Sequence, residues 1–208
     1  MNEKIYQPDK QVMMRILWPA NFYKLKSQVG INKPTPTDIV IHIHGGGFIS
    51  MGSASHQNIT RFLANQLGVP VFSIDYRLAP EAPHPAAVND CYQAYVWILT
   101  QAEKQLGMQI KRVLLTGDSA GGYLTTTTAY LAALRGFRMP DALMPCYPIY
   151  HLDHRFTPST LITIDEWMLS ERFMASIYTM FLKDGGNKEN PLVTPTVAPL
   201  ALLRMLPP

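Results

Sequence analysis

Short apolar runs alternate with helically periodic segments along the chain from residue 39 onward. Between residues 86 and 105, apolar side chains recur at i, i+3, i+4, i+7, i+8 and i+11, which puts them on one face of a helix. Strands that alternate with helices in this way predict a parallel sheet covered by helices. The expected strands are 39–43, 69–74, 112–116 and 142–145, and the expected helices between them are 58–67, 86–105 and 123–135.

Two segments fall outside this alternation. Within residues 1–37, the apolar side chains of segment 12–17 have the spacing of a helix. Residues 151–190 begin as a loop and continue with aromatic and methionine side chains over 166–182, which predicts one or two helices. The length of the chain suits one domain, so we expect residues 1–208 to form a single unit.

The most informative motif is the segment 117–122, which reads Gly-Asp-Ser-Ala-Gly-Gly. It contains Gly-x-Ser-x-Gly between a predicted strand and a predicted helix, which is the context of a nucleophile elbow. Gly117 and Gly121 leave room for the strained turn that such an elbow requires. Ser119 would then present its hydroxyl at a helix N-terminus, where a developing negative charge is favoured. The motif therefore predicts Ser119 as a catalytic nucleophile.

A glycine-rich loop, His44-Gly45-Gly46-Gly47, follows the predicted strand 39–43. Consecutive glycines leave backbone N–H groups free to face a substrate oxygen, which is the chemistry of an oxyanion hole. We expect the donors to be Gly45 and Gly46, together with Ala120, the residue after the nucleophile. Phosphate binding is the other use of such a loop, but the chain has neither Gly-Lys-Ser/Thr nor a helix-opening Gly-x-Gly-x-x-Gly.

Together with Asp-Tyr-Arg-Leu-Ala-Pro-Glu at 75–81 and Asn-Pro-Leu-Val-Thr-Pro at 190–195, these motifs resemble the hormone-sensitive lipase family of α/β-hydrolases, and the animal-type members in particular. The resemblance implies an α/β-hydrolase fold: a mostly parallel, eight-stranded sheet with flanking helices and a helical cap. It implies that carboxylic esters such as acylglycerols are cleaved through Ser119 without a cofactor. On this basis we expect 1–37 and 151–190 to contribute to the cap or lid.

The family's catalytic order is serine, then acid, then histidine. In the family the acid follows a strand that starts after a Leu-Pro-Pro stretch, and this sequence ends on Leu206-Pro207-Pro208. We therefore expect the triad acid and histidine, and the last strands of the sheet, to be missing from these residues. Two alternatives to an ester hydrolase stay open. One is a non-catalytic ligand-binding protein, like the plant hormone receptors of this fold, and the other is an inactive fragment with an exposed sheet edge.

Other candidate groups for chemistry are few. His151 and His154 flank Asp153 and offer a rearranged base and acid. A metal site built on His42 and His44 has no third ligand in view, so no metal is expected.

Three further positions are read as structural. Asp75 and Arg77 resemble a structural pair at a strand end, and Asp118 is taken as part of the elbow without a catalytic role. Cys91 and Cys146 each lie in an apolar run and are expected to be buried free thiols.

Composition narrows the class of partner. The chain is 47% hydrophobic and 16% charged, which is typical of a globular protein. A net charge of +3 without a basic cluster gives no reason to expect nucleic acid. The sequence contains no apolar run of about 18 residues, so no transmembrane segment is predicted. The first residues lack the apolar core of a secretion signal. We expect an apolar ester substrate, a cytoplasmic location that extends to lipid droplets, and contact of the cap with lipid; the oligomeric state stays open.

Overall fold

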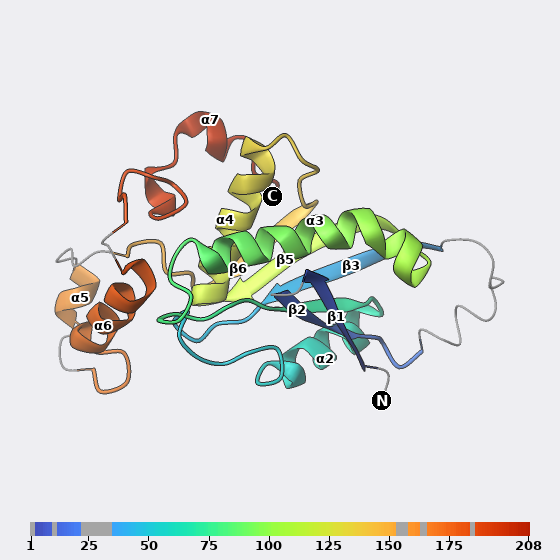
Figure 1. Ribbon diagram of the computed structural model, residues 1–208, viewed down its shortest axis with the longest axis horizontal. Coiled ribbons are helices and arrows are strands. Elements are labelled where there is room, and N and C mark those ends of the chain that lie inside the picture. Colours follow the sequence, from blue (N-terminus) through green and yellow to red (C-terminus); the bar gives the residue numbers. More distant parts are fainter. Residues whose placement is uncertain (1–2, 10–11, 22–34, 153–157, 163–165, 184–185) are drawn as a thin grey trace.

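The computed structural model describes residues 3–9, 12–21, 35–152, 158–162, 166–183 and 186–208. It contains one six-stranded sheet in the order β1-β2-β4-β3-β5-β6 (Figure 1). The strands are β1 (Glu3–Asp9), β2 (Val12–Leu17), β3 (Thr35–Ile43), β4 (Val71–Asp75), β5 (Met108–Asp118) and β6 (Ala142–Cys146). Strands β4, β3, β5 and β6 are parallel, and β2 and β1 extend the sheet antiparallel. The predicted α/β fold with a mostly parallel sheet is confirmed.

Strand β2 corrects one prediction, because this segment was expected to be a helix. Its side chains alternate as in a strand: Val12 and Met14 are fully buried, whereas Met13 between them is 44% exposed. The short apolar pattern fits both periods, and antiparallel pairing with β4 decides between them. Most of the described part of residues 1–37 therefore lies in the sheet rather than in a cap, and residues 22–34 lie outside the described part.

Helices α2 (Gln57–Leu67), α3 (Ala86–Leu106) and α4 (Ala120–Leu134) begin and end close to the predicted bounds. Helices α3 and α4 cover one face of the sheet and α2 covers the other (Figure 1). Strand β3 faces both layers, because Ile41 and Ile43 pack in the core with α3 and α4 while Val40 packs with Ala64 of α2. By the same alternation, His42 faces α2.

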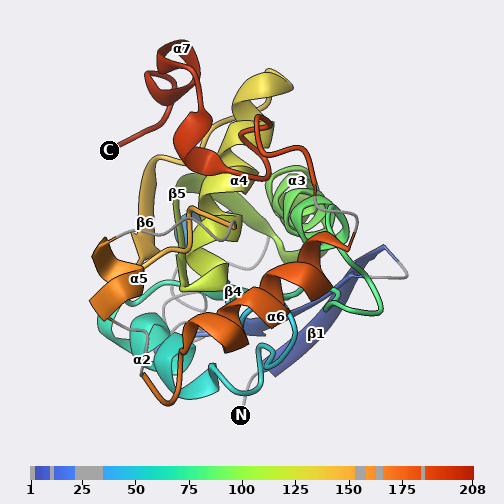
Figure 2. The ribbon, with the colours of Figure 1, turned by 90° about the vertical axis from the view of Figure 1, so that its left-hand side faces the viewer.

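Helix α4 is the central helix, and its residues are buried without a break from Ala120 to Ala133. The sheet lies on one side of it and residues 186–208 lie on the other (Figure 2). Those residues form η1 (Pro195–Val197) and α7 (Leu200–Leu203), from which Leu202 packs against Tyr130 of α4. The Leu143 N–H of β6 donates to the Pro208 carbonyl at 3.0 Å, so the end of the chain lies along that strand.

Helices α5 (Pro158–Ile162) and α6 (Glu171–Leu182) lie beside each other at one end of the sheet (Figures 1 and 2). Helix α6 begins later than the predicted 166–182. The Glu166 carboxylate accepts the N–H groups of Met168 and Leu169 at 2.8 and 2.7 Å, which forms a turn, and Ser170 then caps the helix.

The two cysteines are both free. Cys91 is fully buried, as predicted, but Cys146 is partly exposed, so the prediction of a buried thiol is wrong there. The loop that follows β6 leaves Cys146 at the end of the sheet, where the core does not cover it. No helix among the described residues is long and apolar enough to cross a membrane.

The threonines of α4 provide a stability test. The Thr125 hydroxyl is buried and has no hydrogen-bond partner among the described residues, whereas the Thr127 hydroxyl donates to the Tyr123 carbonyl at 3.1 Å. Leaving a buried polar group unpaired costs about 1–3 kcal/mol, so Thr125→Val is expected to raise the free energy of unfolding by about 1 kcal/mol. Urea denaturation measures this value. The matched control, Thr127→Val, is expected to lower it, and equal destabilisation by both variants would contradict the prediction.

Candidate active site

The elbow between β5 and α4 places Ser119 at the first turn of a buried helix. Ser119 has φ 54° and ψ −117°, a conformation that a residue with a β-carbon adopts only when the surrounding structure imposes it. Its backbone N–H donates to the Cys146 carbonyl of β6 at 2.9 Å, which holds the turn. The side chain is partly exposed, and within the described chain its hydroxyl has no hydrogen bond.

Two glycines let the elbow approach strand β3. A β-carbon at Gly117 would lie 2.5 Å from the Ile43 carbonyl oxygen, and one at Gly121 would overlap that same oxygen. The strain of the turn already explains why glycine is needed at these two positions. The structure adds the second reason, which is the direct contact between the start of α4 and the end of β3.

The loop after β3 supplies backbone donors, but only one of the two expected there is free among the described residues. The Gly45 N–H donates to Asp118 Oδ1 at 3.2 Å and is therefore engaged within the protein. Gly46 and Gly47 have φ 111° and 62°, and among the described residues their N–H groups donate no hydrogen bond. The prediction of Gly45 as an oxyanion donor is thus corrected, because its N–H already faces a carboxylate. Gly46 and Ala120 keep free donors, and Gly47 joins them.

The side chains of Tyr76 and His44 hold the first two peptides of the glycine loop. The Tyr76 hydroxyl donates to the His44 carbonyl at 2.9 Å, and the His44 ring stacks on Tyr76 at 4.2 Å. His44 Nδ1 lies 2.7 Å from the Gly45 carbonyl, and because a carbonyl only accepts, this nitrogen carries a proton. Helix α6 covers the outside of the loop, where Phe181 stacks on Phe48 at 3.9 Å.

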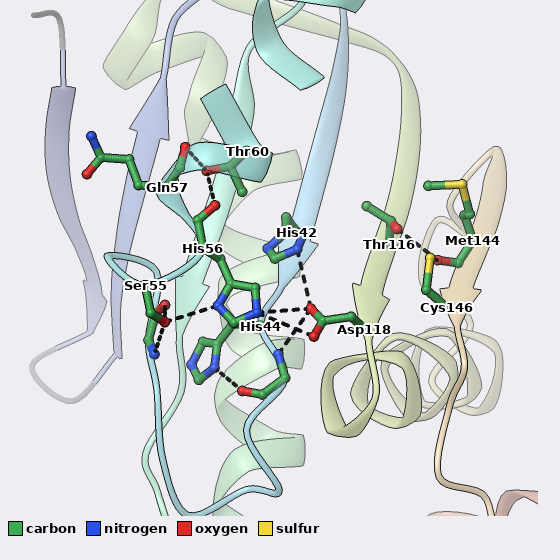
Figure 3. Close-up of polar contacts among 12 residues, drawn as sticks. His42, His44, Ser55, His56, Gln57, Thr60, Thr116, Asp118, Met144 and Cys146 are labelled. Carbon is green, nitrogen blue, oxygen red and sulfur yellow. Dashed lines mark hydrogen bonds and ion pairs between the residues drawn. The ribbon is translucent and has the colours of Figure 1, made fainter. Parts of the chain in front are cut away.

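Asp118, the residue before Ser119, lies at the centre of a polar cluster (Figure 3). His56 Nε2 lies 3.2 Å from Asp118 Oδ1 and 3.3 Å from its Oδ2, and His42 Nε2 lies 3.7 Å from Oδ1. No local pattern predicts this pairing, because His56 lies in a segment with no motif and precedes Asp118 by 62 positions.

Burial and charge act on these groups in different directions. The hydrogen bond and charge of Asp118 raise the pKa of His56 in spite of its burial. Burial alone would raise the pKa of Asp118, but the hydrogen bond and charge of His56 bring that pKa below its ordinary value. Burial lowers the pKa of His42 to about 4 and also lowers the pKa of His44. The pair thus favours a charged His56 beside an ionised Asp118, while burial favours the neutral form of His42 and His44.

The remaining candidates lie elsewhere. Asp75 and Arg77 do not pair: the Asp75 carboxylate accepts the Ser53 N–H at 2.6 Å, and Arg77 binds Asp90 at 2.7 Å, so that prediction is wrong. Each side chain is held by a different partner: Asp75 accepts a hydrogen bond from Ser53, and Arg77 donates hydrogen bonds to Asp90.

The rearranged base is not supported by contacts in the structure. His151 lies 3.4 Å from the Thr196 hydroxyl rather than on Ser119, and Asp153 and His154 lie outside the described residues. In the part of the chain that the structure describes, no three His, Cys, Asp or Glu side chains are grouped to hold a metal ion.

A pocket of about 380 Å³ opens between α4, β6 and the C-terminal residues. Its lining includes Tyr130, Leu143, Tyr150 and Leu203 but neither Ser119 nor the glycine loop. It is therefore separate from the arrangement around the elbow.

Comparison with known proteins places this geometry in a family. A family model described as the alpha/beta hydrolase fold matches residues 40–208, most of the chain. The chain belongs to the α/β-hydrolase fold family. Its resemblance to hormone-sensitive lipase is confirmed as well: the mouse protein is 44% identical over 136 residues, which cover 65% of this chain and 18% of that lipase.

Other relatives of this α/β-hydrolase are esterases by name. An arylesterase of Saccharolobus solfataricus is 33% identical over 172 residues, covering 80% of this chain and 54% of the relative. The crystal structure of an esterase from the archaeon Pyrobaculum calidifontis superposes with a TM-score of 0.81 at 29% identity, covering 96% of this chain and 62% of that one. The chain thus spans less than two thirds of the length of each of these relatives.

The glycine contact of the hydrolase elbow is testable by substitution. Gly121→Ala is expected to lower the free energy of unfolding by about 3 kcal/mol or more, because its methyl group overlaps the Ile43 carbonyl and the backbone has to move. Gly136→Ala is the control: it meets no atom within 4 Å, and its φ of 61° alone costs about 1–2 kcal/mol. Chemical denaturation compares the two, and equal losses would show that the contact is unimportant.

The charge state of the hydrolase cluster is testable by NMR titration of the histidine ring protons. His56 is expected to titrate above pH 6.5 and His42 at about 4. The stabilisation from the His56–Asp118 pair is then complete below pH 6.5 and is lost as the pH rises through the raised pKa of His56. Asp118→Asn should lower the His56 pKa and leave His84 unchanged. A His56 titration that Asp118→Asn does not move would contradict the assignment.

Proposed function

We propose that the protein is a serine carboxylic-ester hydrolase that forms an acyl-enzyme on Ser119. One observation carries the proposal. The Ser119 hydroxyl, at the start of α4, has no hydrogen-bond partner in the described chain. Near it are three backbone N–H groups that also donate to nothing there, those of Gly46, Gly47 and Ala120. A hydroxyl nucleophile next to convergent N–H donors is what acyl transfer requires.

In this mechanism Ser119 Oγ attacks the ester carbonyl carbon, and the carbonyl oxygen becomes an oxyanion. The N–H groups of Gly46, Gly47 and Ala120 stabilise that charge, aided by the N-terminus of α4. The alcohol leaves, and water then cleaves the acyl-enzyme. The proton acceptor and its orienting carboxylate are, in this proposal, a histidine and an acid that lie outside residues 1–208.

The side chains around the loop support an apolar substrate. Ile177 of α6 lies against Gly47, because a β-carbon there would be 3.0 Å from its Cδ1 atom. Large apolar side chains are exposed on and before α6, namely Leu161, Ile162, Trp167, Met168, Leu169 and Phe173. We propose that 151–190 form a cap that contacts acyl chains and a lipid surface, that the substrates include acylglycerols, and that the protein acts in the cytoplasm at lipid droplets. Relatives named as lipase and arylesterase support the ester class.

The test uses protein expressed from the complete gene and a series of p-nitrophenyl esters of increasing acyl length. Ser119→Ala is expected to lower kcat by about 10⁶-fold, the loss that follows removal of a serine nucleophile. Thr100→Ala, which removes an exposed hydroxyl on α3, is the matched control and should keep full activity. A fluorophosphonate probe should label the wild type and not Ser119→Ala.

Two outcomes separate the candidate functions. Hydrolysis that depends on Ser119 establishes the hydrolase, and residues 1–208 alone are then expected to show little turnover because they lack the proton acceptor. If neither the wild type nor Ser119→Ala hydrolyses any ester of the series, the proposal fails and a non-catalytic ligand-binding protein becomes the better account.

A further inference from the structure

The Asp118 carboxylate lies in direct contact with the loop that supplies the oxyanion donors. It accepts the Gly45 N–H at 3.2 Å, and a β-carbon on Gly45 would overlap its Oδ2 atom and lie 2.9 Å from the Asp118 backbone oxygen. No other residue type at position 45 lets the loop approach so closely. The residue before the nucleophile thus also serves as the support of the glycine loop.

The contacts fix two successive peptide planes of the loop. The plane of the His44 carbonyl and the Gly45 N–H is held at both ends, by the Tyr76 hydroxyl and by Asp118 Oδ1. The next plane contains the Gly45 carbonyl and the Gly46 N–H, and His44 Nδ1 holds that carbonyl at 2.7 Å. Because a peptide is planar, fixing the carbonyl also fixes the direction of the Gly46 N–H, which donates to nothing in the described chain.

The hydrogen bonds around His56 fit a doubly protonated ring. The Ser55 hydroxyl donates its one proton to the Gly52 carbonyl at 2.7 Å, so toward His56 Nδ1, 3.1 Å away, it only accepts. At the other nitrogen, Nε2 donates to Asp118. Each ring nitrogen thus faces an acceptor, as an imidazolium would. The rings that face His56 are His42 of β3 and His44 of the loop that follows it, and burial lowers the pKa of both.

A positive charge at His56 reduces the repulsion between the Asp118 carboxylate and an oxyanion that forms nearby. A carboxylate next to the nucleophile opposes the negative charge that develops on the substrate oxygen, because like charges repel strongly in a partly buried site. An imidazolium on the far side of that carboxylate offsets the repulsion. Ordinary helix capping does not explain His56, because it is the N-cap residue of α2 and its side chain caps nothing.

We propose that Asp118 and His56 are positioning residues of the ester hydrolysis proposed above: Asp118 holds the Gly45 peptide so that the Gly46 and Gly47 N–H groups face the oxyanion, and His56 holds and neutralises Asp118. Neither residue touches the substrate. The inference rests on the proposed function for its kinetic consequence, but not for its structural one.

The kinetic test uses protein expressed from the complete gene and a p-nitrophenyl ester. Asp118→Ala is expected to lower kcat by about 10²–10³-fold, the range for loss of one oxyanion donor, with KM within about threefold. Asp118→Asn keeps an acceptor for the Gly45 N–H and should stay within about tenfold of the wild type. His56→Ala should lower kcat by at least about tenfold, because the carboxylate then keeps an uncompensated charge.

Asp141→Ala is the matched control. Its carboxylate also accepts a backbone N–H of β5, that of Val113 at 2.8 Å, but away from the elbow. It should lower stability and leave kcat unchanged. If Asp118→Ala lowers kcat no more than Asp141→Ala, or if Asp118→Asn is as slow as Asp118→Ala, the positioning role is wrong.

A second readout needs no turnover and uses residues 1–208. Amide hydrogen exchange by NMR should show the Gly45 N–H exchanging at least about tenfold faster in Asp118→Ala than in the wild type, while Leu115 in β5 is unchanged. If Ser119 proves inert toward esters, the proposed function fails, and this exchange still decides whether Asp118 holds the loop. Unchanged exchange at Gly45 would overturn the inference even in an active enzyme.

Discussion

The close approach of helix α4 to the end of strand β3 is the constraint on which the rest of the site depends. Ile43 pairs with Gly117 in the sheet, so β3 and β5 end side by side and the two loops leave from the same edge. Gly121 then lets the first turn of α4 contact the Ile43 carbonyl. That backbone contact alone makes Ser119 and the glycine loop neighbours. Without it, Asp118 would not reach the Gly45 N–H.

The ion pair closest in sequence to Ser119 is that of His56 and Asp118. Four titratable side chains lie together, His42, His44, His56 and Asp118, yet burial keeps the first two neutral. The remaining imidazole lies 3.2 Å from the carboxylate and offsets its charge when protonated, and the backbone N–H groups and the α4 terminus near Ser119 favour an anion. Such fixed dipoles need little reorganisation when an oxyanion forms, which is the condition for efficient stabilisation of that charge.

The sequence predicted the parallel sheet and the helices on it because their periodicities are long and distinct. It failed at β2, where six residues fit a helix and a strand equally well and pairing with β4 decides. It identified Ser119 and the glycine loop from local motifs. It misassigned Gly45, because which N–H stays free depends on a carboxylate 73 positions away. The role of His56 was missed for the same reason: contacts between distant segments leave no local pattern.

The use of His56 in this cluster has a consequence for helix α2. An N-cap position normally holds a serine, threonine or aspartate that accepts an N–H of the first turn, and an acidic residue nearby complements the helix dipole. Helix α2 has neither: its N-cap side chain is turned toward Asp118, and its first turn contains no acid. Its opening turn therefore lacks two of the usual stabilising interactions of a helix N-terminus. We expect local unfolding of α2 to begin at this turn, because the His56 side chain contacts Asp118 at the end of β5 instead of capping the helix.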